Sequence, residues 1–123
     1  MKRDKELMRE ILLQVEASTT TTGWIELELP GHSEVEVSNH VELLSEAGFL
    51  QAHDLSTLDG PDWRPERLTY EGHEFLDTVR DPEIWRNTRE AAKKIGSSSV
   101  EVLFEIGKNS VKQKLAQHEV HLP

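Results

Sequence analysis

Cysteine is missing from this 123-residue sequence, and its apolar residues never form a long uninterrupted run. Without cysteine there are no disulfides and no thiolate metal ligands, which fits a cytoplasmic protein. No segment approaches the ~20 apolar residues of a membrane-spanning helix, so we expect no membrane partner. The charged N-terminus leads into an amphipathic pattern and not into an apolar secretory core, so we expect no signal peptide.

Positive charge is also scarce, and it is unevenly distributed. The chain has 14 lysines and arginines against 23 aspartates and glutamates, which gives a formal net charge of −9. Residues 31–62 contain seven carboxylates and neither lysine nor arginine. This balance opposes non-specific binding to nucleic acid. The acidic window is either a solvated face or a surface for a basic partner.

Hydrophobic periodicity predicts a mixture of helices and short strands. Leu7, Ile11 and Val15 recur at helical spacing, whereas residues 24–29 alternate strictly and predict a strand. Ser33 and Glu36 have the spacing of a helix-capping box. The elements expected in order are helix 2–17, strand 24–29, helix 34–47 ending at Gly48, strands 49–56 and 63–68, a helix capped by Thr69, helix 82–95 capped by Asp81, and a last helix from the Ser98–Glu101 capping box to about 115.

This order predicts an α+β fold: a winged-helix-like domain with a small antiparallel sheet and a C-terminal two-helix extension. The winged-helix-like domain spans residues 1–80. The extension, residues 81–117, is expected to belong to the same compact unit, and residues 118–123 form a tail. Only 14 residues separate Ser18 from Ser33, so the supporting helix usual in such domains is short or missing.

Two segments resemble known families. The segment Val37–Leu50, with its Leu-Leu pair and terminal Ala-Gly, resembles the recognition-helix segment of arsenic-repressor-type winged helices. Together with Met1–Asp4, His40–Gly48 and Ile84-Trp85, the sequence Leu68–Asp77 resembles a family of uncharacterised small proteins common in bacteriophages and prophages. The resemblance implies a winged-helix-like fold, a phage or mobile-element origin and the cytoplasm of a bacterial host. It supplies no catalytic residue and no known ligand.

The winged-helix resemblance favours a DNA-linked transcriptional regulator. Ser38 and Asn39 are expected on the exposed face of the reading helix, where they could contact base edges. Basic side chains that could reach phosphates are Arg64 and Arg67 beside the wing, and Lys2, Arg3 and Lys5 at the N-terminus.

The charge pattern favours an alternative, an acidic protein-interaction module that acts as an inhibitor, antirepressor or DNA-mimic-like adaptor. Such a module would bind a basic host or phage protein. The carboxylates proposed for this surface are Glu34, Glu42, Glu46, Asp54 and Asp59.

Apolar residues continue beyond the winged-helix-like domain and suggest a homodimer through Trp85, Leu103 and Phe104. The alternative is that these residues only complete the core of the monomer. None of the six histidines has zinc-site spacing, so we expect no metal and no cofactor. The chain has no cysteine nucleophile, glycine-rich phosphate loop or serine-centred elbow, and we therefore expect a non-enzymatic protein.

Overall fold

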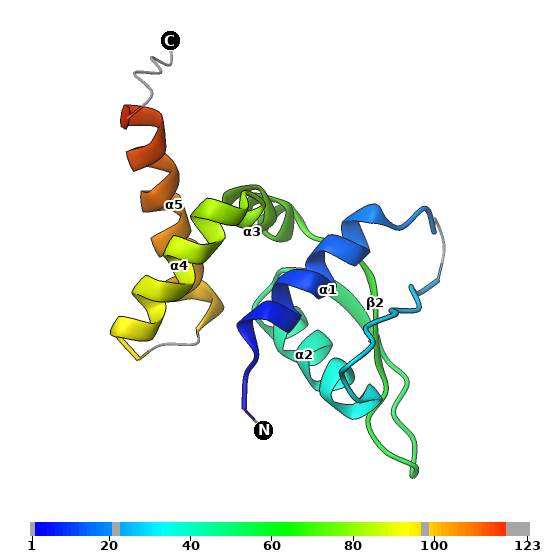
Figure 1. Cartoon of the computed structure of the whole chain (residues 1–123). Helices are drawn as coiled ribbons and strands as arrows, with labels where there is room; N and C mark the ends of the chain where they lie inside the picture. Colours follow the sequence, from blue (N-terminus) through cyan, green and yellow to red (C-terminus); the bar gives the residue numbers. More distant parts are fainter. Residues whose placement is uncertain (1, 21–22, 97–98, 118–123) are drawn as a thin grey trace. The chain divides into compact units, whose positions relative to one another are not determined.

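The computed structural model describes residues 2–20, 23–96 and 99–117. These residues form an α+β fold, as predicted, with the elements α1, α2, β1, β2, α3, α4 and α5 in chain order (Figure 1). The chain divides into two compact units, residues 1–74 and 75–123, whereas the sequence suggested one unit with a boundary after Arg80. Within the described part of the chain, no helix is long and apolar enough to cross a membrane.

Helix α1 (Lys5–Ala17) begins where Asp4 caps it. Asp4 Oδ1 accepts hydrogen bonds from the backbone N–H groups of Glu6 and Leu7, at 3.0 and 3.2 Å. Because Asp4 is extended, with φ −112°, the helix starts later than the predicted Lys2. The helix buries one apolar face, formed by Leu7, Met8, Ile11, Leu12 and Val15.

Helix α2 (Glu34–Glu46) begins and ends close to the predicted residues. Ser33 Oγ accepts a hydrogen bond from the Glu36 N–H at 3.1 Å, which confirms one half of the expected capping box. The Glu36 carboxylate, however, binds His32 Nδ1 at 2.5 Å. Gly48 follows the helix with φ +85°, the left-handed conformation that ends many helices.

A hairpin of two antiparallel strands, β1 (Leu50–Asp54) and β2 (Trp63–Leu68), completes the secondary structure of the first unit up to α3. The register shifts between Gln51 and Ala52, which is a β-bulge. Helices α1 and α2 contact each other, and both contact β2 (Figure 1). Strand β2 spans the predicted residues, whereas β1 is shorter than the predicted 49–56.

The prediction of a strand over residues 24–29 is wrong. Within the described residues, one backbone hydrogen bond joins this segment to β2, from the Ile25 N–H to Pro65 O at 2.8 Å. Proline has no N–H to donate in return, so the pairing does not continue as a ladder. The segment is held instead by Gln14 of α1, whose amide donates to Glu28 O at 2.5 Å and accepts from Glu28 N at 3.1 Å.

Helix α3 (Tyr70–Val79) begins against the turn that follows α2. The Thr69 N–H donates to Phe49 O at 3.1 Å, and Thr69 Oγ1 donates to Gly48 O at 2.5 Å while it accepts from the Gly72 N–H at 3.0 Å. A Cβ added to Gly72 would overlap the Phe49 carbonyl oxygen. The Leu-Thr-Tyr-Glu-Gly sequence therefore joins α3 to the Ala-Gly-Phe turn through tightly packed backbone.

Helices α4 (Pro82–Lys94) and α5 (Val100–Gln117) pack on each other in the second unit. Asp81 caps α4 as predicted, because its Oδ1 accepts hydrogen bonds from the first turn. Lys114 Nζ of α5 lies 2.6 Å from Asp81 Oδ2 and so connects the end of α5 to the start of α4. Ser98 of the predicted capping box and the predicted tail, residues 118–123, lie outside the described residues.

The residues proposed for a dimer interface lie mostly inside the chain. Trp85 is 4% exposed and Leu103 is 1% exposed, so the prediction that they face a second copy is wrong for these two side chains. The Phe104 ring is half-buried, 5.7 Å from the Phe75 ring. Both Trp85 and Leu103 belong to the core because each lies on the buried side of its amphipathic helix.

Candidate functional site

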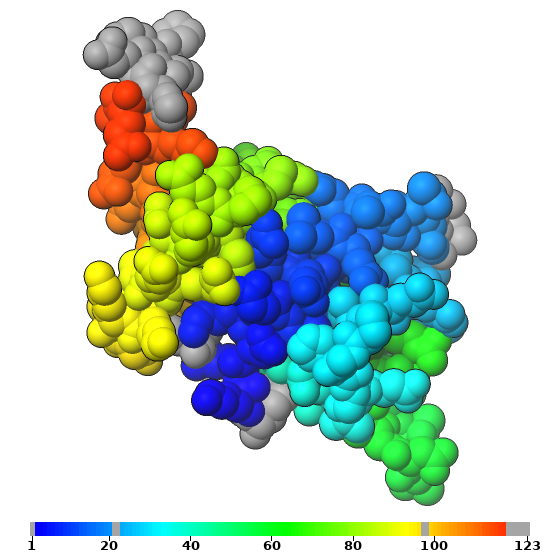
Figure 2. Space-filling view, in the orientation of Figure 1, coloured from blue at the N-terminus to red at the C-terminus, as the bar shows by residue number. Residues whose placement is uncertain are grey.

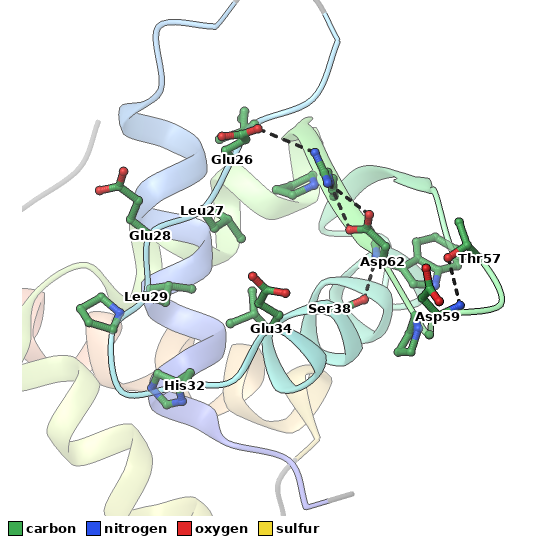
Figure 3. A pocket seen from close by; sticks show the side chains of 18 residues that line it. Glu26, Leu27, Glu28, Leu29, His32, Glu34, Ser38, Thr57, Asp59 and Asp62 are labelled. Carbon is green, nitrogen blue, oxygen red and sulfur yellow. Dashed lines mark hydrogen bonds and ion pairs between the residues drawn. The ribbon is translucent and has the colours of Figure 1, made fainter.

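An open groove of about 870 Å³ lies in the first unit between three segments (Figure 3). Residues 25–30 form one side, the start of α2 forms the second, and residues 57–65 of the hairpin form the third. The lining contains five carboxylates, from Glu26, Glu28, Glu34, Asp59 and Asp62. Among the described residues that line the groove, Arg64 is the one lysine or arginine.

The lining is layered by polarity. Four half-buried apolar side chains form its floor, those of Leu27, Leu29, Val37 and Trp63, and Ile25, Pro30, Pro61 and Pro65 also line the groove. Glu26, Glu34 and Asp59 are exposed and come from the three different segments, so they form an acidic rim around that floor (Figure 3). A groove of this kind matches a ligand that carries both apolar groups and positive charge.

Arg64 does not offset the acidic rim as a free cation. Its guanidinium donates to both carboxylate oxygens of Asp62, at 3.1 and 3.2 Å, and its Nη1 lies 3.8 Å from Glu26 Oε1. It also lies 5.6 Å from the Trp24 ring centroid. The hydrogen bond to Asp62 raises the pKa of Arg64 above its ordinary value. The negative charges of Asp62, Glu26 and Glu34 raise it further. The predicted phosphate contact would have to break these interactions.

Ser38 is placed differently from the prediction. It is 4% exposed, and its Oγ accepts a hydrogen bond from the Trp63 N–H at 2.7 Å. The expectation that Ser38 lies on an exposed reading face is wrong, because the hairpin packs over this turn of α2 and takes the hydroxyl as its hydrogen-bond partner. Ser38 and Arg64 are the members of the predicted nucleic-acid-binding set that line the groove.

The other predicted nucleic-acid-binding residues do not line the groove. Asn39 is half-buried on α2, and Arg67 is exposed on β2, where its Nη1 donates to Leu68 O at 3.0 Å. At the N-terminus, Lys2 and Arg3 are exposed and Lys5 is half-buried.

Two of the five predicted acidic residues, Glu34 and Asp59, line the groove. Glu42, Glu46 and Asp54 lie outside it. Asp54 Oδ1 accepts a hydrogen bond from the Ser56 N–H at 3.0 Å, and the hydrogen bonds from Ser56 lower the pKa of Asp54. The structure therefore brings two of the five predicted carboxylates to the groove and leaves the other three outside it.

Three carboxylates that line the groove, those of Glu26, Glu28 and Asp62, were not predicted as site residues from the sequence. The alternation of residues 24–29 contained the signal for two of them, because it separates the glutamates from Leu27 and Leu29. Asp62 ends the sequence Asp59-Gly60-Pro61-Asp62, a composition that predicts only a turn. Nothing in the sequence indicated that this turn lies across a groove from residues 25–30.

His40 is a buried structural residue of the first unit. Its side chain is 0% exposed. Its Nε2 accepts a hydrogen bond from the Asp4 N–H at 2.9 Å, and its Nδ1 donates to Glu36 O at 2.7 Å. The ring therefore joins the start of α1 to the first turn of α2.

Asp4, His32 and Glu36 are the side chains that could hold a metal ion in the described part of the chain, since their donor atoms lie within 4.8 Å of one another. Each already has a partner, however. Asp4 caps α1, and His32 Nδ1 lies 2.5 Å from Glu36 Oε1. The hydrogen bond with Glu36 raises the pKa of His32, and the charges of Glu36, Asp4 and Glu10 add to this. The cluster is fully accounted for as an ion pair beside a helix cap.

The structure defines a small α+β protein with an acidic groove, and comparison with known proteins places it in a family. The profile of the family described as hypothetical protein DUF2513 matches residues 2–99, and the chain belongs to this family. The chain is 32% identical over 121 residues to an uncharacterized protein of Haemophilus influenzae, which covers 94% of this chain and 100% of that protein. No solved structure matches the chain. The groove lies entirely within the matched residues.

Proposed function

We propose that this protein is a non-enzymatic, phage-derived regulatory adaptor whose groove binds a basic segment of a host or phage protein in the bacterial cytoplasm. The observation that carries this proposal is the lining of the groove, which combines five carboxylates with an apolar floor. Carboxylates attract lysine and arginine from a distance, and the floor supplies apolar contact once the partner is seated. The phage origin rests on the resemblance of Leu68–Asp77 described above.

The geometry supports a protein partner better than DNA. The order of α1, α2, β1, β2 and α3 is similar to that of a winged helix, and in such a domain α2 and the hairpin would approach DNA. Here these two elements form the acidic groove, which repels phosphates. Ser38 is buried and Arg64 is paired with Asp62, so two of the predicted DNA contacts are already engaged.

The proposal is tested by the binding of defined probes to the full chain. A labelled peptide in which lysine or arginine alternates with valine is titrated and followed by fluorescence anisotropy, beside a random duplex DNA. The double variant Glu34→Gln, Asp59→Asn removes two rim charges. We expect it to weaken peptide binding by about tenfold, and we expect added salt to weaken binding to the unmodified protein.

The matched control is the double variant Glu42→Gln, Glu46→Gln, which loses the same charge outside the groove. We expect it to bind the peptide within about twofold of the unmodified protein, because screened charges outside the site contribute little. If both variants weakened peptide binding equally, the effect would come from the net charge of the protein and not from the groove, which would contradict the proposal. The DNA-linked regulator would be favoured instead if the protein bound the duplex, if salt weakened that binding and if the variants strengthened it.

A further inference from the structure

We propose that the partner segment binds in the groove as an extended strand, hydrogen-bonded to the backbone of Leu27. This inference rests on the proposed function and deepens it, because it states the conformation of the partner and the backbone groups that it contacts. Strand addition to an open edge is a common way of recognising an extended peptide. In the first unit, that edge is the segment 24–29, which was predicted as a strand and left largely unpaired.

The hydrogen bonds around Leu27 fix the direction of its backbone groups. In an extended chain, the N–H and C=O groups of alternate residues point to the same edge. The Ile25 N–H points toward β2, since it donates to Pro65 O at 2.8 Å. Both the N–H and the C=O of Glu28 point to the other edge, where they bind Gln14. Leu27 therefore directs its N–H and C=O toward the β2 side.

Strand β2 does not use these groups. Alternation places the Trp63 N–H on the same edge of β2 as Pro65, and this N–H donates to Ser38 Oγ at 2.7 Å. Neither backbone group of Leu27 has a hydrogen-bond partner within the described chain. Leu27 lines the groove, so a ligand in the groove can reach them. Pro65 and Ser38 thus keep the edge at Leu27 open.

The side chains along the groove indicate the composition of the bound strand. Successive residues of a strand point to opposite faces, so one set can contact the floor at Leu29 and Val37 while the other set faces the rim. The rim carboxylates of Glu26 and Asp59 favour lysine or arginine in the second set. The partner is therefore a protein segment in which apolar and basic residues alternate.

Backbone methylation of the alternating peptide tests this binding mode. Two peptides of the same sequence carry N-methyl groups on alternate amides, in one register or in the other. Because a strand directs only every second amide to Leu27, we expect one register to weaken binding to the full chain by about tenfold and the other to change it by less than about threefold. In the complex, hydrogen exchange of the Leu27 amide should slow by about tenfold or more, while that of Glu26, on the opposite edge, should change little.

The outcomes separate this inference from the proposed function. If the peptide binds and the Glu34, Asp59 variant weakens it, but both methylated registers behave alike and Leu27 exchange is unchanged, strand addition is wrong and the acidic groove remains the binding site. If no alternating basic peptide binds, the proposed function fails, and the inference that rests on it fails as well.

Discussion

Gln14 and Glu28 form a pair in which a side chain takes the place of a neighbouring strand. The Gln14 amide donates to Glu28 O at 2.5 Å and accepts from Glu28 N at 3.1 Å. This double contact uses both backbone groups of one residue, as a strand partner would. It fixes the segment 24–29 to α1 and so holds one side of the groove in place.

Replacing Gln14 with alanine should therefore loosen that side of the groove. We expect the Gln14→Ala variant to lose about 1 kcal/mol of unfolding free energy, because both bonds are partly solvated. Hydrogen exchange at the Glu28 amide should become several-fold faster, which NMR would detect. Gln113→Ala, at an exposed position of α5, is the control and should leave Glu28 unchanged. Equal exchange rates at Glu28 in all three proteins would contradict the role of Gln14.

Replacing His40 with alanine should strongly destabilise the first unit. The change removes a fully buried ring, leaves the Asp4 N–H without its acceptor and removes the ring's hydrogen bond to Glu36 O. We expect a loss of about 2–4 kcal/mol in urea unfolding. His73→Ala, at an exposed position of α3, should change stability by less than about 0.5 kcal/mol. A loss at His40 as small as that at His73 would show that the ring does not join α1 to α2.

The ion pair of His32 and Glu36 should make stability depend on pH. Glu36 raises the pKa of folded His32 above the ordinary 6.5. The protonated form is thus the stabilised one: the contribution is complete below pH 6.5 and is lost as the pH rises through the raised pKa.

Thermal unfolding of the unmodified protein and of His32→Gln, from about pH 5 to about pH 8, tests this dependence. The difference in Tm should be largest at the acidic end and should shrink as the pH rises. The other histidines are common to both proteins, so their titration cancels in the difference. A difference that stays constant, or grows with pH, would contradict the assignment.

Two glycines in helices should respond differently to alanine. Alanine usually stabilises a helix relative to glycine, but a Cβ at Gly72 would overlap the backbone carbonyl of Phe49. Backbone cannot rotate away as a side chain can, so Gly72→Ala should cost about 2 kcal/mol or more. At Gly107, the nearest atom to a Cβ would be Thr78 Cγ2 at 3.1 Å, a side-chain atom that can shift. Gly107→Ala should be the milder change in urea unfolding, and the reverse order would contradict this packing.

The sequence by itself determined the features that depend on a few neighbouring residues. Asp81 and Ser33 cap helices where their spacing predicted, because a cap is a contact between a side chain and the next turn. Gly48 follows the end of α2 in the left-handed conformation, a preference of glycine itself that needs no distant contact. The periodicity of α1 and the α+β class follow from the same local patterns.

The tertiary structure alone decided how distant segments meet. Ser38 faces inward because a hairpin residue, Trp63, needs an acceptor for its N–H, and no pattern within α2 shows that need. Residues 24–29 alternate as a strand should, yet a strand needs a partner that both accepts and donates hydrogen bonds. Pro65 O accepts from the Ile25 N–H, but Pro65 has no N–H to donate in return. The groove also depends on the tertiary structure, because Glu26, Glu34 and Asp59 come from three segments that meet only when the chain packs. Their negative charges act together only once these side chains are close.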